Sequence, residues 1–110
     1  MIYNISVSEP WFTLIKMGLK SREGRLNKTK FAKLKVNDIV IWTYKNKSCK
    51  TKIVNINKYD SFRDMIKKET LKRTLPGVPT IDCGVEVYRQ YYSEELEKKF
   101  GVLAIELKRI

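Results

Sequence analysis

The chain has 110 residues, with 23 lysines and arginines, 12 aspartates and glutamates, and no histidine. Its length corresponds to a single domain over residues 1–110, and its hydrophobic content of 43% is enough to build a core. The lack of histidine excludes Cys2His2 zinc sites, Ser-His or Cys-His nucleophile pairs and a histidine general base.

No apolar run approaches the roughly 18 residues that cross a bilayer, and the N-terminal segment lacks the basic region of a secretion signal. We therefore expect a cytoplasmic protein with no membrane partner. Cys49 and Cys83 form no CxxC pair. We expect both thiols to be reduced, and we expect neither a metal nor a cofactor.

The net charge of +11 is concentrated in the first half of the chain. Residues 16–35 contain eight lysines and arginines with Glu23 as the only acid, whereas residues 59–110 are nearly neutral. This asymmetry predicts one basic face, as a nucleic-acid partner requires. A solubilising lysine surface, or a face that meets an acidic protein partner, remains an alternative interpretation.

Alternating apolar and polar residues predict a strand over residues 2–7. A helix is expected to begin at Ser8-Glu9-Pro10, with Ser8 as its cap, and to end at Gly18. Residues 20–26 are expected to be extended, and residues 26–35 to form a basic loop.

The extended segment predicts two faces. Strand geometry would place Glu23 and Arg25 on one face and Lys20 and Arg22 on the other. Gly24 predicts a bulge or a close approach of another part of the chain.

Later elements follow from hydrophobic runs and capping residues. Further strands are predicted over residues 39–44, 49–57 and 102–107. Further helices are predicted to begin at Ser61, Asp82 and Ser93. The first of these is expected to end at Thr70 or Thr74. This order predicts an α+β fold with a small, mostly antiparallel, curved sheet or barrel and helices packed across its openings.

The run from Gly18 to Arg25 reads GxKxxExR, which resembles the signature of the ASCH domain, a PUA-like fold. Its place after a strand and a proline-started helix agrees with that family. Three other segments also agree with the family pattern: Asn37–Val40, Tyr59–Phe62 and Tyr91–Ile105. The resemblance covers nearly the whole chain and implies a PUA-like β-barrel with a cleft beside the motif.

The resemblance also implies partners among RNA, DNA and modified nucleosides. Some bacterial members of the family hydrolyse N4-acetylcytidine with the motif lysine, a threonine on the motif strand and a separate glutamate. By position the lysine is Lys20, but Glu23 occupies the threonine's place. Glu69 and Glu86 are candidates for the separate glutamate. Ribonuclease activity has been ascribed to other members.

Lys20 is the leading site candidate. With a lowered pKa it would act as a base or nucleophile, and protonated it would bind a phosphate or a base carbonyl. Glu23 and Arg25 would form either a structural ion pair or a binding site for a base's exocyclic amine, with Glu23 as a second catalytic group in an enzyme. Arg22 is a candidate phosphate contact.

Aromatic and basic residues complete the predicted site. Trp11 and Trp42 are expected in the core, whereas Phe12 and Tyr44 are candidates for stacking on a base. Tyr92 and Ser93 are expected near the cleft by resemblance. Four lysines are expected to neutralise phosphates: Lys28, Lys30, Lys33 and Lys35.

Two functions follow from this site. The first is a nucleic-acid-binding module that holds RNA, or an unpaired or modified nucleobase, in a cleft beside the motif. The second is a small metal-independent hydrolase of an acylated nucleoside, or a ribonuclease, that uses Lys20. We favour binding, because the sequence does not reveal a complete catalytic set.

Overall fold

The computed structural model describes all 110 residues of the chain. Its strands are β1 (Ile2–Ser6), β2 (Arg22–Leu26), β3 (Ile39–Tyr44), β4 (Lys47–Tyr59) and β5 (Val102–Arg109). Its helices are α1 (Trp11–Lys16), the 3-10 helix η1 (Thr29–Lys33), α2 (Phe62–Glu69), α3 (Leu71–Thr74), α4 (Ile81–Arg89) and α5 (Glu94–Phe100). None of the helices is long and apolar enough to cross a membrane.

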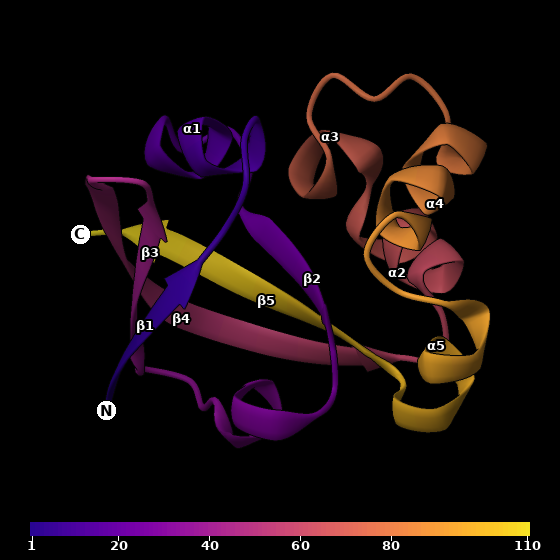
Figure 1. The fold of residues 1–110 in the computed structure, drawn as a ribbon, viewed down its shortest axis with the longest axis horizontal. Coiled ribbons are helices and arrows are strands. Elements are labelled where there is room, and N and C mark those ends of the chain that lie inside the picture. The colour runs from indigo at the N-terminus through magenta and orange to yellow at the C-terminus, as the bar shows by residue number, and fades with distance from the viewer.

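The five strands form one sheet in the order β1-β3-β4-β5-β2. β1 pairs in parallel with β3, and all other neighbours are antiparallel. The sheet curls into a half-barrel, with α1 over one part and α2 to α5 gathered on the other side (Figure 1). The predicted α+β architecture, with helices packed against a curved sheet, is confirmed. The strands β1 and β2 are the two edges of this sheet.

Two hydrophobic clusters hold the sheet to its helices. One lies under α1 and includes Phe12, Ile15, Val40, Trp42 and Ile105. The other lies under α2 and α4 and includes Phe62, Met65, Ile66, Leu75 and Tyr88. Trp11 packs against both clusters, so it lies at the junction between them.

The β3–β4 hairpin is longer than predicted. Its turn consists of Lys45 and Asn46 alone, and Lys45 adopts a positive φ of 53°. β4 therefore begins at Lys47 and continues to Tyr59, past a register shift after Ile53. Tyr44 pairs with Lys47, so the two strands stay paired up to the turn and only two residues are left to connect them.

The start of α1 differs from the prediction that Ser8 caps it. No side chain caps the helix at Pro10, the residue before its first turn. Instead the Glu9 carboxylate accepts hydrogen bonds from the Thr13 amide at 2.9 Å and the Thr13 hydroxyl at 2.6 Å. The Ser8 hydroxyl lies 3.1 Å from the hydroxyl of Tyr91, so it joins α1 to the end of α4.

The helix that begins after Ser61 is confirmed, and the Ser61 hydroxyl caps it. The helix ends at Glu69 because Thr70 adopts a φ of +80°, which interrupts the helical backbone before α3. The prediction that Asp82 caps α4 is wrong, since the hydroxyl of Thr80 accepts the capping hydrogen bond. Asp82 lies in the first turn, where its charge still favours the helix dipole.

Candidate functional site

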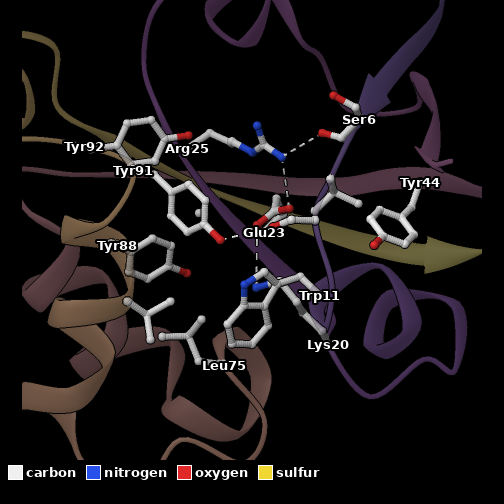
Figure 2. A pocket seen from close by; sticks show the side chains of 14 residues that line it. Ser6, Trp11, Lys20, Glu23, Arg25, Tyr44, Leu75, Tyr88, Tyr91 and Tyr92 are labelled. Carbon is white, nitrogen blue, oxygen red and sulfur yellow. Dashed lines mark hydrogen bonds and ion pairs between the residues drawn. The ribbon is translucent and has the colours of Figure 1, made fainter.

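A cavity of about 400 Å³ lies between the two edge strands of the half-barrel and the helices α1 and α4 (Figure 2). This volume is within the range of small-molecule sites, roughly 300–1,000 Å³, and suits a nucleobase or a nucleoside. Its wall contains five aromatic side chains: Trp11, Tyr44, Tyr88, Tyr91 and Tyr92. Its charged lining consists of three motif side chains: Lys20, Glu23 and Arg25.

The motif begins where α1 ends. Gly18 adopts a φ of +80°, which ends the helix as predicted. The amides of Leu19 and Lys20 both donate to the carbonyl of Leu14, at 3.0 and 3.1 Å. The chain then turns back and enters β2 at Arg22, and this turn directs the motif side chains toward the cavity.

Lys20 is buried at 2% exposure. Its ammonium donates hydrogen bonds to the carbonyl oxygens of Arg22 (2.9 Å) and Thr74. The same nitrogen lies 3.6 Å from Oε1 of Glu23. The two carbonyls thus use two of the three N–H donors of the ammonium group, and Glu23 balances its charge as an ion pair. Burial lowers the pKa of Lys20, although the charge of Glu23 acts in the opposite direction.

The predicted separation of Lys20 from Glu23 on opposite faces is wrong. β2 begins at Arg22, so Lys20 precedes the strand and does not follow its alternation. Both side chains therefore line the same cavity. Arg22 lies on the other face of the strand, as the alternation predicts.

Arg25 closes the gap between the two sheet edges. Its Nη2 atom lies 3.4 Å from Oε2 of Glu23 on β2 and 3.4 Å from the carbonyl oxygen of Ser6 on β1. Its guanidinium also lies over the rings of Phe31 and Trp42, at 4.8 and 5.7 Å. Burial disfavours the charge of Arg25, but Glu23 and Tyr92 together outweigh this effect and raise its pKa above the ordinary value.

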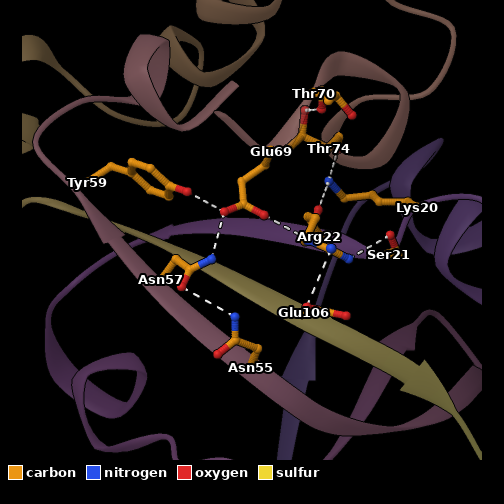
Figure 3. A network of polar contacts seen from close by, with 10 residues as sticks. All are labelled: Lys20, Ser21, Arg22, Asn55, Asn57, Tyr59, Glu69, Thr70, Thr74 and Glu106. Carbon is orange, nitrogen blue, oxygen red and sulfur yellow. Dashed lines mark hydrogen bonds and ion pairs between the residues drawn. The ribbon is translucent and has the colours of Figure 1, made fainter. Parts of the chain in front are cut away.

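Arg22 belongs to a second polar network, outside the cavity (Figure 3). Its guanidinium contacts Glu69 at 2.9 Å and Glu106 at 3.4 Å. Glu69 also accepts hydrogen bonds from Asn57, at 2.9 Å, and from the Tyr59 hydroxyl. Arg22 is therefore engaged by carboxylates, and this arrangement does not leave it directed at a phosphate.

Neither candidate for the separate glutamate lines the cavity. Glu69 lies in the network just described, and Glu86 is exposed on α4. Glu23 is the only acid in the cavity. No group of three or more acidic or cysteine side chains could hold a metal ion.

The structure separates the predicted aromatic candidates. Tyr44 and Tyr92 line the cavity, but Phe12 is only 1% exposed in the core and cannot stack on a ligand. Trp11, expected in the core, is half-buried: it packs against both hydrophobic clusters and also lines the cavity. A six-residue helix is too short for its apolar spacing to define one buried face. Ser93 caps α5 by accepting from the Leu96 amide at 3.2 Å and does not line the cavity.

Two of the five aromatic wall residues, Tyr88 and Tyr91, were not among the candidates from the sequence. Together with Tyr92 they have helical i, i+3, i+4 spacing, which could have suggested a shared aromatic face at the end of α4. Their large separation from the motif along the chain gave no indication that they lie beside it.

The four predicted phosphate-binding lysines lie in the segment that follows β2, in or beside η1; we call it the basic ridge (Lys28, Lys30, Lys33 and Lys35). None of them lines the cavity. The ring of Phe31 lies between the two sites, 4.8 Å from the Arg25 guanidinium and 5.9 Å from the Lys30 ammonium. The basic ridge therefore adjoins the Arg25 side of the cavity.

The family model of the ASCH domain matches residues 5–110, so the chain belongs to the ASCH domain family. It is therefore a PUA-like domain, a class associated with RNA binding and related activities. Two solved structures are similar to it. The crystal structure of hypothetical protein PH0355 is 44% identical with a TM-score of 0.93, and the match covers 100% of both chains.

The solution NMR structure of protein PF0455 from Pyrococcus furiosus is 39% identical with a TM-score of 0.84. That match covers 100% of this chain and 98% of the other. No curated protein matches the sequence. The predicted family and fold are thus confirmed over the full length.

The two hydrogen bonds and the ion pair of Lys20 predict a large effect of its removal on stability. Lys20→Met leaves two buried carbonyls without their donor and weakens the pairing of Glu23. We expect a loss of about 3–5 kcal/mol in the free energy of unfolding, measured by chemical denaturation. The exposed Lys16 provides a matched control, and Lys16→Met should change stability by at most about 0.5 kcal/mol. Equal effects of the two substitutions would contradict the anchoring role.

Glu69 predicts a pH dependence of stability. Burial alone raises its pKa, but hydrogen bonds from Tyr59, Asn57 and Arg22 outweigh burial and lower it. The deprotonated form therefore stabilises the fold above the unfolded pKa of about 4.3, and this contribution disappears as the pH falls through the lower folded pKa.

Glu69→Gln should accordingly be less stable than the wild type near neutral pH. The difference should shrink as the pH is lowered below about 4.3. Urea denaturation across the acid range measures it. Glu86→Gln, at an exposed position, should show no such convergence, and a pH-independent difference for Glu69→Gln would refute the assignment.

Proposed function

We propose that the protein binds RNA by holding an unpaired or modified nucleobase in the cavity while the basic ridge binds the adjoining phosphates. The observation that carries this proposal is the cavity itself, in which five aromatic side chains surround the three charged groups of the motif. Aromatic faces bind unstacked bases, and polar groups between them read the base edge.

The charges in the cavity suit a base better than a phosphate. Lys20 and Arg25 are both paired with Glu23, whose carboxylate would repel a phosphate at the same place. A neutral heterocycle with donors and acceptors avoids this repulsion. The phosphates would then bind to the basic ridge, where Lys30, Lys33 and Lys35 are exposed.

The ion pairs leave Glu23 with capacity for a ligand. Each carboxylate oxygen has one cationic partner, at 3.6 Å for Lys20 and 3.4 Å for Arg25. Both separations exceed the roughly 2.7–2.9 Å of a strong charge-assisted hydrogen bond. A carboxylate has about four acceptor positions, so N–H groups of a base can still bind it.

The basic ridge predicts how RNA binding depends on salt. A variant with Lys28, Lys30, Lys33 and Lys35 changed to Gln should bind single-stranded RNA more weakly. Its slope of log affinity against log salt should fall by up to about 3, because each single-strand phosphate contact contributes about 0.7. Fluorescence anisotropy over a range of salt concentrations measures both effects.

The matched control has the same change of charge at four exposed positions outside the basic ridge, on β4 and α2: Lys50, Lys58, Lys67 and Lys68 changed to Gln. This control should retain most of the affinity and the slope. RNA binding that ignores salt, or no binding at low ionic strength, would refute the proposal. Capture of an acidic protein through the same ridge, without RNA binding, would favour the protein-partner alternative.

The second candidate function is hydrolysis of an acylated nucleoside. The lowered pKa of Lys20 favours it, because a buried amine that loses its proton is a base or nucleophile. Against it, the Lys20 ammonium is held by two carbonyls and paired with Glu23, and the cavity has no acid besides Glu23.

Purified protein with a chelator and N4-acetylcytidine provides the test. Hydrolysis would release cytidine and acetate, separable by chromatography. Turnover that disappears in a Lys20→Met protein with an unchanged circular dichroism spectrum would support the enzyme. A lack of turnover across a panel of acylated nucleosides would leave binding as the function.

A further inference from the structure

Tyr88 carries the one buried side-chain polar atom that has no hydrogen-bond partner in the protein. The residue is 4% exposed on α4, and its hydroxyl points toward the space between Glu23, Trp11 and Leu75 (Figure 2). A buried hydroxyl without a partner costs folding free energy, and native proteins contain few such groups. Phenylalanine would fill the same space without this cost, so the hydroxyl calls for a functional explanation.

The position of this hydroxyl is fixed by packing. The Tyr88 ring stacks on Phe62 with centroids 4.3 Å apart and an angle of 11° between the planes. Phe62 stacks in turn on Tyr92, at 5.4 Å and 13°. On the opposite side the motif glycine leaves room for it, because a Cβ atom on Gly24 would lie 2.8 Å from the Tyr88 oxygen. Such a preorganised group binds a ligand with little loss of entropy.

Tyr88 adds a hydrogen-bond donor to the acceptor supplied by Glu23. Burial raises the pKa of Tyr88 well above the ordinary value, and the charge of Glu23 raises it further, so the phenol stays protonated. Glu23, when ionised, only accepts. The methyl group of Met65 lies on the same side of Gly24, 2.9 Å from that Cβ position. The Tyr88 oxygen is itself covered in the free protein, so a ligand reaches it only when a neighbouring side chain shifts, and the flexible thioether of Met65 beside it can do so.

Resting on the proposed function, we infer that Tyr88 selects the base: its hydroxyl donates a hydrogen bond to the carbonyl oxygen of guanine, while Glu23 accepts hydrogen bonds from the N–H groups of that base. The edge of guanine has an exocyclic amine and a ring N–H beside a carbonyl. It therefore offers two donors to the two carboxylate oxygens and one acceptor to the phenol.

The other bases satisfy this pair of groups less well. Adenine and cytosine each have one amino group beside an unprotonated ring nitrogen, so a second donor for Glu23 is missing. Uracil has a single N–H between two carbonyls, and one of these would face the carboxylate. A site that leaves buried polar groups unpaired discriminates strongly against such a ligand.

The test compares the wild type, Tyr88→Phe and a matched control, Tyr3→Phe, which removes a hydroxyl away from the cavity. The probes are short oligouridylates with one central guanosine, inosine or adenosine, measured by fluorescence anisotropy. We expect the guanosine probe to bind tightest to the wild type and the control. Tyr88→Phe should weaken its binding about three- to tenfold, with the salt dependence unchanged.

The melting temperature separates this role from a structural one. Tyr88→Phe removes an unpaired buried hydroxyl, so it should melt at the same or a higher temperature than the wild type. A probe with 6-thioguanosine examines the same bond from the ligand side, because sulfur is a weak acceptor. The 6-thioguanosine probe should bind the wild type more weakly than the guanosine probe does. The two probes should bind Tyr88→Phe with about equal affinity.

Each of the other possible outcomes overturns one part of the proposal. Equal binding of guanosine by the wild type and Tyr88→Phe removes the role of Tyr88. A lower melting temperature with an unchanged base preference makes the residue structural. A Tyr88-dependent preference for another base overturns the choice of guanine. Failure of the wild type to bind any probe at low salt overturns the proposed function itself.

Discussion

The buried ammonium of Lys20 is the interaction on which the site depends. An ammonium inside a protein loses several kcal/mol of hydration unless acceptors replace the water. Lys20 finds its acceptors in three places: the carbonyl of Arg22 on β2, the carbonyl of Thr74 at the end of α3, and the carboxylate of Glu23. These contacts of one ammonium group therefore join the motif strand to the helical half of the protein and hold the acid that faces the cavity.

This arrangement links the stability of the fold to the shape of the cavity. α3 has only four residues and is separated from α2 by the positive φ of Thr70, so it has little stability of its own. The bond from Lys20 to Thr74 fixes its end, and the next residue, Leu75, then lies in the cavity wall. Removing the lysine would disturb the wall as well as the charge.

Local features of the fold could be predicted because their causes are local. The strand patterns, the cap at Ser61 and the helix end at Gly18 each depend on a few neighbouring residues. The motif also identified the three charged groups of the cavity. Their mutual geometry could not be predicted, because Lys20 precedes β2 and does not follow the alternation of that strand. Tyr88 on α4 and Tyr91 just beyond it could not be assigned to the site, because only the fold brings them to the motif.

The half-barrel leaves its two edges, β1 and β2, without a partner strand between them. Unpaired edges ordinarily invite another chain, but here the guanidinium of Arg25 spans the seam to the carbonyl of Ser6, and the cavity occupies the rest. A molecule bound in the cavity would touch both edges at once and act as a cross-link between the first and last strands of the sheet. Occupancy and closure of the barrel are therefore thermodynamically coupled, and a bound base would oppose the local opening of the two strands, each of which is paired on one side only.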